Sequence, residues 1–334
     1  MKLSRRALLA AGAATIGCAQ AQTPRVPLIT GVNLAGLEFN SSALPGVRDT
    51  NYATPTAAHL DYYRRCGARA VRIPFLWERL QPRLGGEFDA GHWRLLHDLI
   101  EATATRGMRL ILDPHQYGRR TEAGAARIIG ESSEVTAAHF AAFWGELARR
   151  CRDAGHVIFG LQNEPHDQNL ARLIEVNRGA IAAIRRAGAR QLILVPGAAW
   201  SGAHSWVQSG NGAALSVLRD PDIAFDVHQF LDTDSSGTHA TCATSAGRRL
   251  EGFTRWAREH EQRGFLSEFG AGANTACATE MATLLDYVAA NRDAWLGWTY
   301  WAGGPWWDED YPLSIEPVNG RDRPQMAVLR RYFE

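Results

Sequence analysis

The 334-residue sequence has almost no lysine, no block of like charges, no low-complexity tract and no long Pro/Ser-rich linker. Lys2 is the only lysine, and arginine supplies the other basic side chains, which indicates a GC-rich bacterial genome. The formal net charge is only +1. This balance excludes the basic surface that binding to nucleic acid or to an anionic membrane requires.

The first 21 residues have the pattern of an export signal. Ser4-Arg5-Arg6 precedes a short apolar run, Ala7–Ile16, and Ala19-Gln20-Ala21 offers a cleavage site. The run is too short for a permanent membrane anchor. The paired arginines favour the twin-arginine route, with an ordinary secretory signal or lipid attachment at Cys18 as alternatives. We therefore expect a secreted or periplasmic protein that comprises residues 22–334.

Eight short apolar runs recur along this mature part, and segments of helical period separate most of them. Continuous apolar runs are typical of strands buried on both faces of a parallel sheet. The runs are Ile29–Asn33, Ala70–Pro74, Leu110–Asp113, Val157–Leu161, Leu192–Val195, Ile223–His228, Phe265–Glu268 and Trp295–Trp301. Only residues 196–222 show little helical pattern between two runs.

Eight strand–helix units predict an α/β fold, a single (β/α)₈ TIM barrel formed by residues 22–334. The rival fold is a doubly wound open sheet. That fold is disfavoured because no Gly-x-Gly-x-x-Gly loop follows the first run.

Polar and aromatic side chains repeatedly stand where the apolar runs end. In a barrel of this class the active site forms at the carboxyl ends of the strands. Any single one of these residues is better explained as a strand cap or a salt bridge, but the whole set predicts a site on one rim. The set comprises Asn33, Arg72, Asp113, His115, Asn163, Glu164, His228, Glu268 and Trp301.

Two glutamates, Glu164 and Glu268, follow the fourth and seventh runs and are expected to face each other across the barrel mouth. Hydrolysis of a glycosidic bond with retention uses two carboxyl groups about 5–5.5 Å apart. The acid needs a raised pKa, whereas the nucleophile needs donors that keep it ionised. Arg72 can supply such donors, and Asn163 can bind the sugar 2-hydroxyl.

Several motifs resemble those of glycoside hydrolase family 5 (clan A), in order from about residue 28 to the C-terminus. Phe159–Pro165 resembles the family's Asn-Glu-Pro signature and Leu266–Gly270 its nucleophile motif. His228–His239 is similar to a loop of the endoglucanase subgroup. Arg72-Ile73-Pro74-Phe75, Asp113-Pro114-His115-Gln116-Tyr117 and Trp298-Thr299-Tyr300-Trp301 fit the remaining strand-end motifs.

The resemblance implies Glu164 as acid/base and Glu268 as nucleophile, without a metal or other cofactor. Arg72, His115, Asn163 and His228 would support them. Trp301 would be a sugar platform, and the other expected substrate contacts are Asn33, Tyr117, Trp200, Trp306 and Trp307. No His-x-His or Asp/His cluster accompanies the two histidines as metal ligands would.

Five further tryptophans follow the second, fifth and eighth runs, namely Trp77, Trp200, Trp206, Trp306 and Trp307. Indole rings stack on the apolar faces of glucose, so a row of exposed tryptophans across the mouth would suit a linear β-glucan. Ordinary loop packing is the alternative for some of them, Trp206 above all.

The cysteines of the mature part divide into two pairs. Cys242 and Cys277 follow neighbouring strands, and the subgroup resemblance also implies that they form a disulfide, which an exported protein can keep. Cys66 and Cys151 fall on helices that are not adjacent in a barrel, so we expect them to be free and buried.

One position departs from the family pattern. Two residues after His228 the family usually has a tyrosine whose hydroxyl contacts the nucleophile, but this chain has Phe230, which offers no donor. We expect a functional consequence. The alternative is that Tyr117 or Tyr300 takes over the role.

The sequence therefore predicts a monomeric, retaining endo-β-1,4-glucanase whose substrate is β-glucan or a cello-oligosaccharide. The alternatives are a related glycanase acting on mixed-linkage glucan, mannan or xyloglucan, and a non-hydrolytic carbohydrate-binding barrel. The presence of both glutamates disfavours the binding barrel. Because no linker or additional binding module is present, soluble or amorphous glucan is favoured over crystalline cellulose.

Overall fold

A computed structural model describes residues 26–334, so the expected export signal, with Cys18, lies outside the described part. Eight parallel strands close into a barrel in the order β1-β10-β9-β8-β7-β6-β3-β2, as predicted. They are β1 (Ile29–Leu34), β2 (Ala70–Phe75), β3 (Arg109–Pro114), β6 (Val157–Gly160), β7 (Ile193–Pro196), β8 (Ile223–His228), β9 (Gly264–Phe269) and β10 (Trp295–Gly303). Each expected run lies within one or two residues of an observed strand end.

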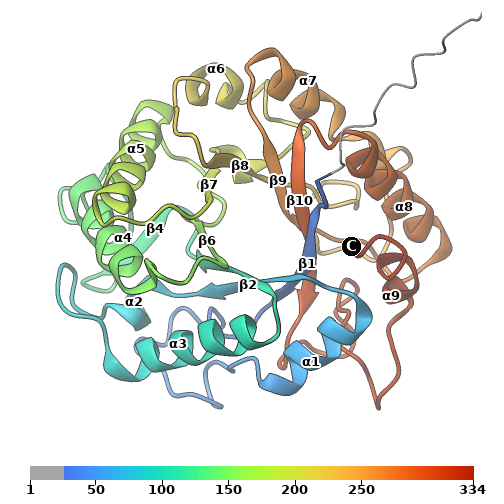
Figure 1. Ribbon diagram of the computed structural model, residues 1–334, viewed down its shortest axis with the longest axis horizontal. Helices are drawn as coiled ribbons and strands as arrows, with labels where there is room; N and C mark the ends of the chain where they lie inside the picture. Colours follow the sequence, from blue (N-terminus) through green and yellow to red (C-terminus); the bar gives the residue numbers. More distant parts are fainter. Residues whose placement is uncertain (1–25) are drawn as a thin grey trace, which may run out of the picture.

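Helices surround the barrel on its outside (Figure 1). They are α1 (Ala57–Cys66), α2 (Trp77–Leu80), α3 (Ala90–Thr105), α4 (Ala137–Cys151), α5 (Leu170–Arg186), α6 (Asn211–Leu215), α7 (Glu251–Glu259), α8 (Thr275–Ala290) and α9 (Pro324–Leu329). Side-chain caps fix several helix starts: Asp89, Asn169 and Asn274 accept backbone N–H groups of the first turns of α3, α5 and α8. None of the helices among residues 26–334 is long and apolar enough to cross a membrane.

The barrel interior changes from apolar to polar along the strands. A buried apolar cluster of Ile111, Ile158, Leu194, Ala224 and Phe265 comes from five neighbouring strands. Side chains two residues apart on a strand share a face. Asp113 and Asp226 therefore point to the same side as Ile111 and Ala224, one step closer to the strand ends, and both are buried. Because an apolar interior disfavours charge, these carboxylates need partners inside the barrel.

Two connections differ in how well the sequence predicted them. Residues 196–222 contain only a 3₁₀ turn (Ala199–Ser201) and the five-residue α6, in agreement with the expected shortage of helix. A small antiparallel hairpin, β4 (Arg119–Glu122) and β5 (Ala125–Ile128), was not predicted. Its strands are only four residues long, too short for a periodic pattern to stand out.

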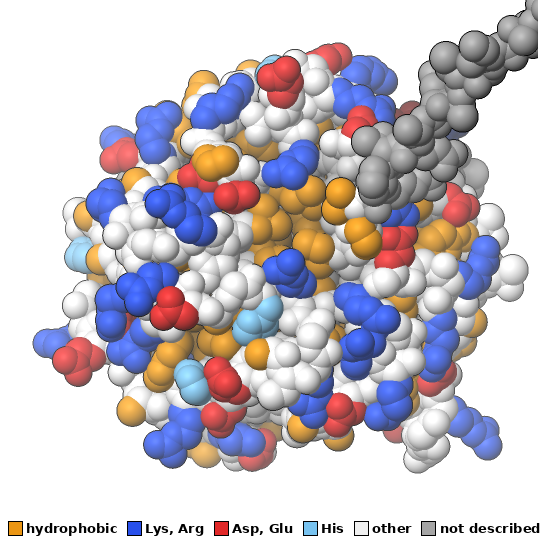
Figure 2. Space-filling model, in the orientation of Figure 1, with side chains coloured by type: hydrophobic (Ala, Val, Ile, Leu, Met, Phe, Trp, Pro, Cys, Tyr) orange, Lys and Arg blue, Asp and Glu red, His pale blue; other side chains and the backbone are white. Residues whose placement is uncertain are grey.

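The cysteine predictions are confirmed. Cys242 and Cys277 form a disulfide with a Cα–Cα distance of 5.2 Å. It joins the connection after β8 to the first turn of α8. Cys66 and Cys151 are free and buried. On the face shown in Figure 2, basic and acidic side chains alternate around the rim and hydrophobic side chains gather near the centre.

Candidate active site

Arg72 is the centre of the polar layer inside the barrel. Its guanidinium is fully buried and lies between two carboxylates. Nη1 is 2.5 Å from Glu268 Oε1, and Nη2 is 2.9 Å from Asp113 Oδ2. Nη1 also donates to Asn33 Oδ1 at 2.9 Å, and Nη2 to Asn163 Oδ1 at 2.8 Å. A single side chain thus ties the ends of β1, β3 and β9 to the loop after β6.

Asn33 was expected to contact substrate, but the structure gives it another role. The side chain is completely buried. Its oxygen accepts from Arg72, and its nitrogen donates to the backbone oxygens of Ser267 (2.8 Å) and Tyr300 (3.2 Å). With donor and acceptor both engaged inside the barrel, Asn33 orients Arg72 and offers no group to a sugar.

Asn163 is held from two sides. Besides accepting from Arg72, it donates through Nδ2 to His115 Nε2 at 3.2 Å. The other ring nitrogen of His115 lies 2.7 Å from Asp113 Oδ2. Burial alone would lower the pKa of His115, but Asp113 outweighs it and the pKa is raised. The amide of Asn163 retains one N–H for a ligand at the site.

Glu164 and Glu268 meet around His228. Carboxylate oxygens of both glutamates and a ring nitrogen of His228 lie within 4.8 Å of one another. His228 Nδ1 is 2.7 Å from Glu164 Oε1 and 3.5 Å from Glu268 Oε2. On the other side of the ring, Nε2 is 3.6 Å from the buried Asp226. The two carboxyl groups are therefore close together, as the mechanism of retaining glycosidases requires.

Three carboxylates around one imidazole control its charge. Burial alone would lower the pKa of His228, but Glu268, Asp226 and Glu164 together raise it to about 10. His228 is therefore an imidazolium at neutral pH. Burial also raises the pKa of Glu268, while His228 and Arg72 oppose that rise by stabilising the carboxylate.

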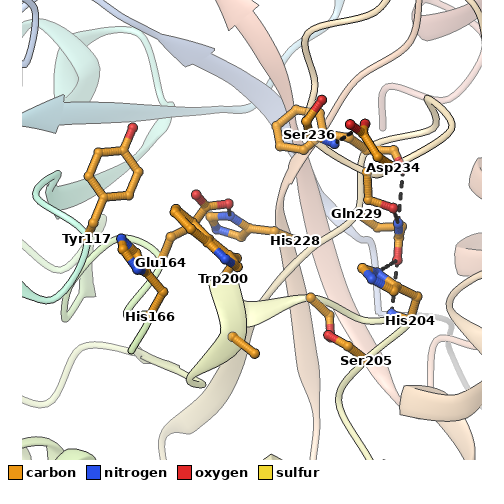
Figure 3. A pocket seen from close by; sticks show the side chains of 14 residues that line it. Tyr117, Glu164, His166, Trp200, His204, Ser205, His228, Gln229, Asp234 and Ser236 are labelled. Atoms are coloured by element: carbon orange, nitrogen blue, oxygen red, sulfur yellow. Dashed lines mark hydrogen bonds and ion pairs between the residues drawn. The ribbon is translucent and has the colours of Figure 1, made fainter. Parts of the chain in front are cut away.

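A cleft of about 640 Å³ opens beside Glu164 (Figure 3). Tyr117, His166 and Trp200 form one side of it, and Trp200 is 49% exposed. Polar groups on the other side include His204, Ser205, Gln229, Asp234 and Ser236. Glu164 and His228 also line the cleft.

The expected row of exposed tryptophans is only partly present. Trp77 and Trp206 are fully buried among other aromatic rings, so their expected place at the mouth is wrong. Trp200 and Trp306 are exposed, and Trp307 is partly so. Trp301 is largely buried and stacks on His115, with ring centroids 5.4 Å apart. Position after a strand did not distinguish exposed indoles from packed ones.

Two groups in the described part of the chain have the composition of a metal site. The first is Glu164, His228 and Glu268, but a protonated imidazole has no lone pair for a metal. The second is Asp232, Asp234 and His239 in the loop after β8. In that loop the backbone N–H of His239 donates to the carboxylate of Asp232, and Arg249 donates to the backbone oxygen of Asp232.

Phe230 packs at the edge of the site. It is buried in a small cluster with Ala35, Trp301 and Leu313. Tyr300 does not replace the missing hydroxyl because its own donates to the backbone oxygens of Ala271 or Leu313. Among the described residues, the polar partners recorded for the Glu268 carboxylate are Arg72 and His228, and neither is a tyrosine.

Sequence reasoning missed four groups near the site. Asp226 could have been found because it stands two residues before His228 on the same strand, and such residues share a face. His166 follows directly after the Glu164-Pro165 pair. Gln229 and Glu38 gave no signal. Glu38 is buried with one unpartnered oxygen, and burial raises its pKa to about 7 although His115 opposes the rise.

A closed parallel barrel with two carboxyl groups at its mouth defines a TIM-barrel glycoside hydrolase. The model of the cellulase family, glycosyl hydrolase family 5, matches residues 30–304. The chain belongs to this family, and it is an enzyme that hydrolyses glycosidic bonds.

Similar proteins agree with this assignment. Endo-beta-1,4-glucanase B of Emericella nidulans is 38% identical over 295 residues, which cover 87% of this chain and 86% of the relative. The structure of XacCel5A in complex with cellopentaose is 42% identical, with a TM-score of 0.87, and covers 91% of this chain and 99% of that one. Pseudomonas stutzeri endoglucanase Cel5A in complex with cellobiose is 33% identical, with a TM-score of 0.84 and 92% of each chain covered.

We predict that Phe230→Tyr increases turnover on soluble β-glucan several-fold and moves the acidic limb of the pH profile to lower pH. Burial raises the pKa of Glu268, and a new O–H donor would stabilise the ionised form and lower that pKa. Steady-state kinetics across pH would measure both effects. Phe230→Leu, which adds no donor, is the matched control. If turnover and the acidic limb are both unchanged in Phe230→Tyr, the missing hydroxyl has no functional role.

Proposed function

We propose that this enzyme is a retaining endo-β-1,4-glucanase in which Glu268 is the nucleophile and Glu164 the acid/base. The observation that carries the proposal is the different setting of the two carboxyl groups. Glu268 is almost completely buried and bound by Arg72, which suits an ionised nucleophile. Glu164 lines the open cleft, where a leaving group can receive a proton.

In the first step Glu268 attacks the anomeric carbon, and Glu164 donates a proton to the departing glycosidic oxygen. In the second step Glu164 takes a proton from water, whose oxygen displaces Glu268 and restores both groups. The second N–H of Asn163 would bind the 2-hydroxyl of the sugar. Trp301, which stacks on His115, would be the aromatic platform for that sugar.

The pair of His228 and Glu164 holds the proton that the first step needs. At 2.7 Å the two groups share one hydrogen bond, and the proton can lie on the imidazole or on the carboxyl group. Transfer from Nδ1 to Glu164 would produce the protonated acid and leave His228 neutral. Because three carboxylates raise the pKa of His228 to about 10, the pair keeps this proton through the neutral range.

The cleft supports a linear β-1,4-glucan as substrate. Trp200 presents an aromatic face to one side of the cleft, and polar groups opposite it can bind sugar hydroxyls. The solved structures of XacCel5A with cellopentaose and of Pseudomonas stutzeri Cel5A with cellobiose also support a cello-oligosaccharide. The leader-like residues 1–21 favour an exported enzyme. A monomer is sufficient because both glutamates come from one chain.

We predict that Glu268→Gln abolishes hydrolysis and still binds intact cellopentaose. Glu164→Gln should lose about 10²–10⁴-fold on cellopentaose but still react with a substrate whose leaving group needs no proton. NMR of the wild-type reaction should show the β-anomer of the new reducing end first. Early appearance of the α-anomer would mean inversion and would reject the double-displacement scheme.

We predict that His228→Asn lowers kcat/KM on cellopentaose by about 10–100-fold, the effect of losing a hydrogen bond between charged groups. The alkaline limb of the pH profile should also move to lower pH. In the wild-type enzyme the imidazolium of His228, whose pKa is about 10, keeps its proton above neutral pH, and an asparagine side chain cannot hold one. An alkaline limb that stays in place would show that His228 does not hold the catalytic proton.

A further inference from the structure

Trp200 is about half exposed in the cleft, yet its backbone is in an unfavourable conformation. Ala199, Trp200 and Ser201 have φ values of 52°, 61° and 54°, in the left-handed region. Non-glycine residues hold such a conformation only where their surroundings fix it. The Trp200 N–H donates to Pro165 O at 3.2 Å. This bond joins the loop after β7 to the loop that carries Glu164.

The inner face of the Trp200 indole lies on His166. The ring centroids are 3.8 Å apart and the planes differ by 13°, so the imidazole and the indole stack face to face. Tyr117 meets Trp200 edge-on at 6.0 Å. The outer face of the indole remains open to the cleft (Figure 3). The orientation of His166 therefore sets the orientation of the surface that a sugar ring would meet.

Arg119, the first residue of the unpredicted hairpin, fixes His166. Arg119 Nη1 lies 3.0 Å from His166 Nε2 and also donates to Tyr117 O at 2.8 Å. His166 Nδ1 lies 2.7 Å from Asp167 Oδ2. Arginine can only donate, so Nε2 must accept, and Nδ1 carries the proton that goes to Asp167. Both ring nitrogens are engaged in a single proton arrangement.

We propose that Arg119 is a positioning residue for the leaving-group side of the cleft: through His166 it orients Trp200 as the platform for the departing sugar. The inference rests on the proposed function, since the departing sugar must lie beside Glu164. Arg119 itself contacts no reacting group. The hairpin thereby acts on the binding of the leaving half of the substrate and leaves the chemistry at Glu268 unchanged.

Two substrates separate this role from catalysis. Cellopentaose places sugars on both sides of the cleaved bond, whereas β-cellobiosyl fluoride loses only fluoride and has no sugar to place on Trp200. Arg119→Met should increase KM for cellopentaose about three- to tenfold, the range of one lost aromatic contact, with kcat within about twofold. Hydrolysis of the fluoride should stay within about twofold of wild type.

Arg119→Lys keeps one donor for His166 Nε2 and should recover most of the cellopentaose affinity. Arg127→Met is the matched control because Arg127 lies on the other strand of the hairpin and pairs with Glu134. Arg127→Met should leave the KM for cellopentaose and the hydrolysis of the fluoride unchanged.

An unchanged KM for cellopentaose in Arg119→Met, together with a raised KM in Trp200→Ala, would overturn the positioning role. Equal losses on both substrates would also overturn it, since they would mean general damage to the barrel. A wild-type enzyme that hydrolyses the fluoride but not cellopentaose would instead overturn the proposed function itself, and this inference with it.

Discussion

The active site depends on one buried cation. Arg72 has no exposed surface and lies between Asp113 and Glu268, and it also donates to the side-chain oxygens of Asn33 and Asn163. A charge inside a barrel is tolerated only when its partners are in place, and removal of one partner of such a pair typically costs about 3–5 kcal/mol. Arg72 therefore makes the position of Glu268 a condition of stable folding as well as of the proposed attack on the sugar.

A second cation, His228, balances the remaining carboxylates. Asp226 and the two glutamates surround it, and this negative environment lets a buried imidazole keep its proton. The two cations have different partners. Of the two glutamates, Arg72 contacts only Glu268. His228 contacts both and lies closer to Glu164. The two glutamates therefore have different cationic partners, although both stand at the same mouth.

The sequence predicted the barrel and the rim because both follow from regular patterns. Strands buried on both faces appear as apolar runs, and the residue that ends each run must lie at the same edge. Side-chain exposure follows no such pattern. Trp77 and Trp200 both come just after a strand, yet one is packed against Phe143 and the other opens to the cleft. Which way a loop turns depends on contacts far away in the chain.

The same limit explains Asn33 and the hairpin. Asn33 stands at the end of its strand, as Glu268 does. Its side chain contacts Arg72 inside the barrel, and the sequence gives no sign of that contact. The Arg119–His166 contact joins residues 47 positions apart, through two connections without a periodic pattern. Local sequence cannot specify such a contact. The departure at Phe230 was visible in the sequence, but its neighbours Ala35, Trp301 and Leu313 were not.

The central claim is that Glu268 forms a covalent bond to the sugar. A cellobioside with fluorine at C2 and a good leaving group slows the second step more than the first, so the glycosyl-enzyme should accumulate. Mass spectrometry of the intact protein followed by peptide mapping would locate the label. The account predicts one label per chain, on Glu268 within the peptide that contains Leu266–Gly270. A label on Glu164, or turnover without any covalent adduct, would contradict it.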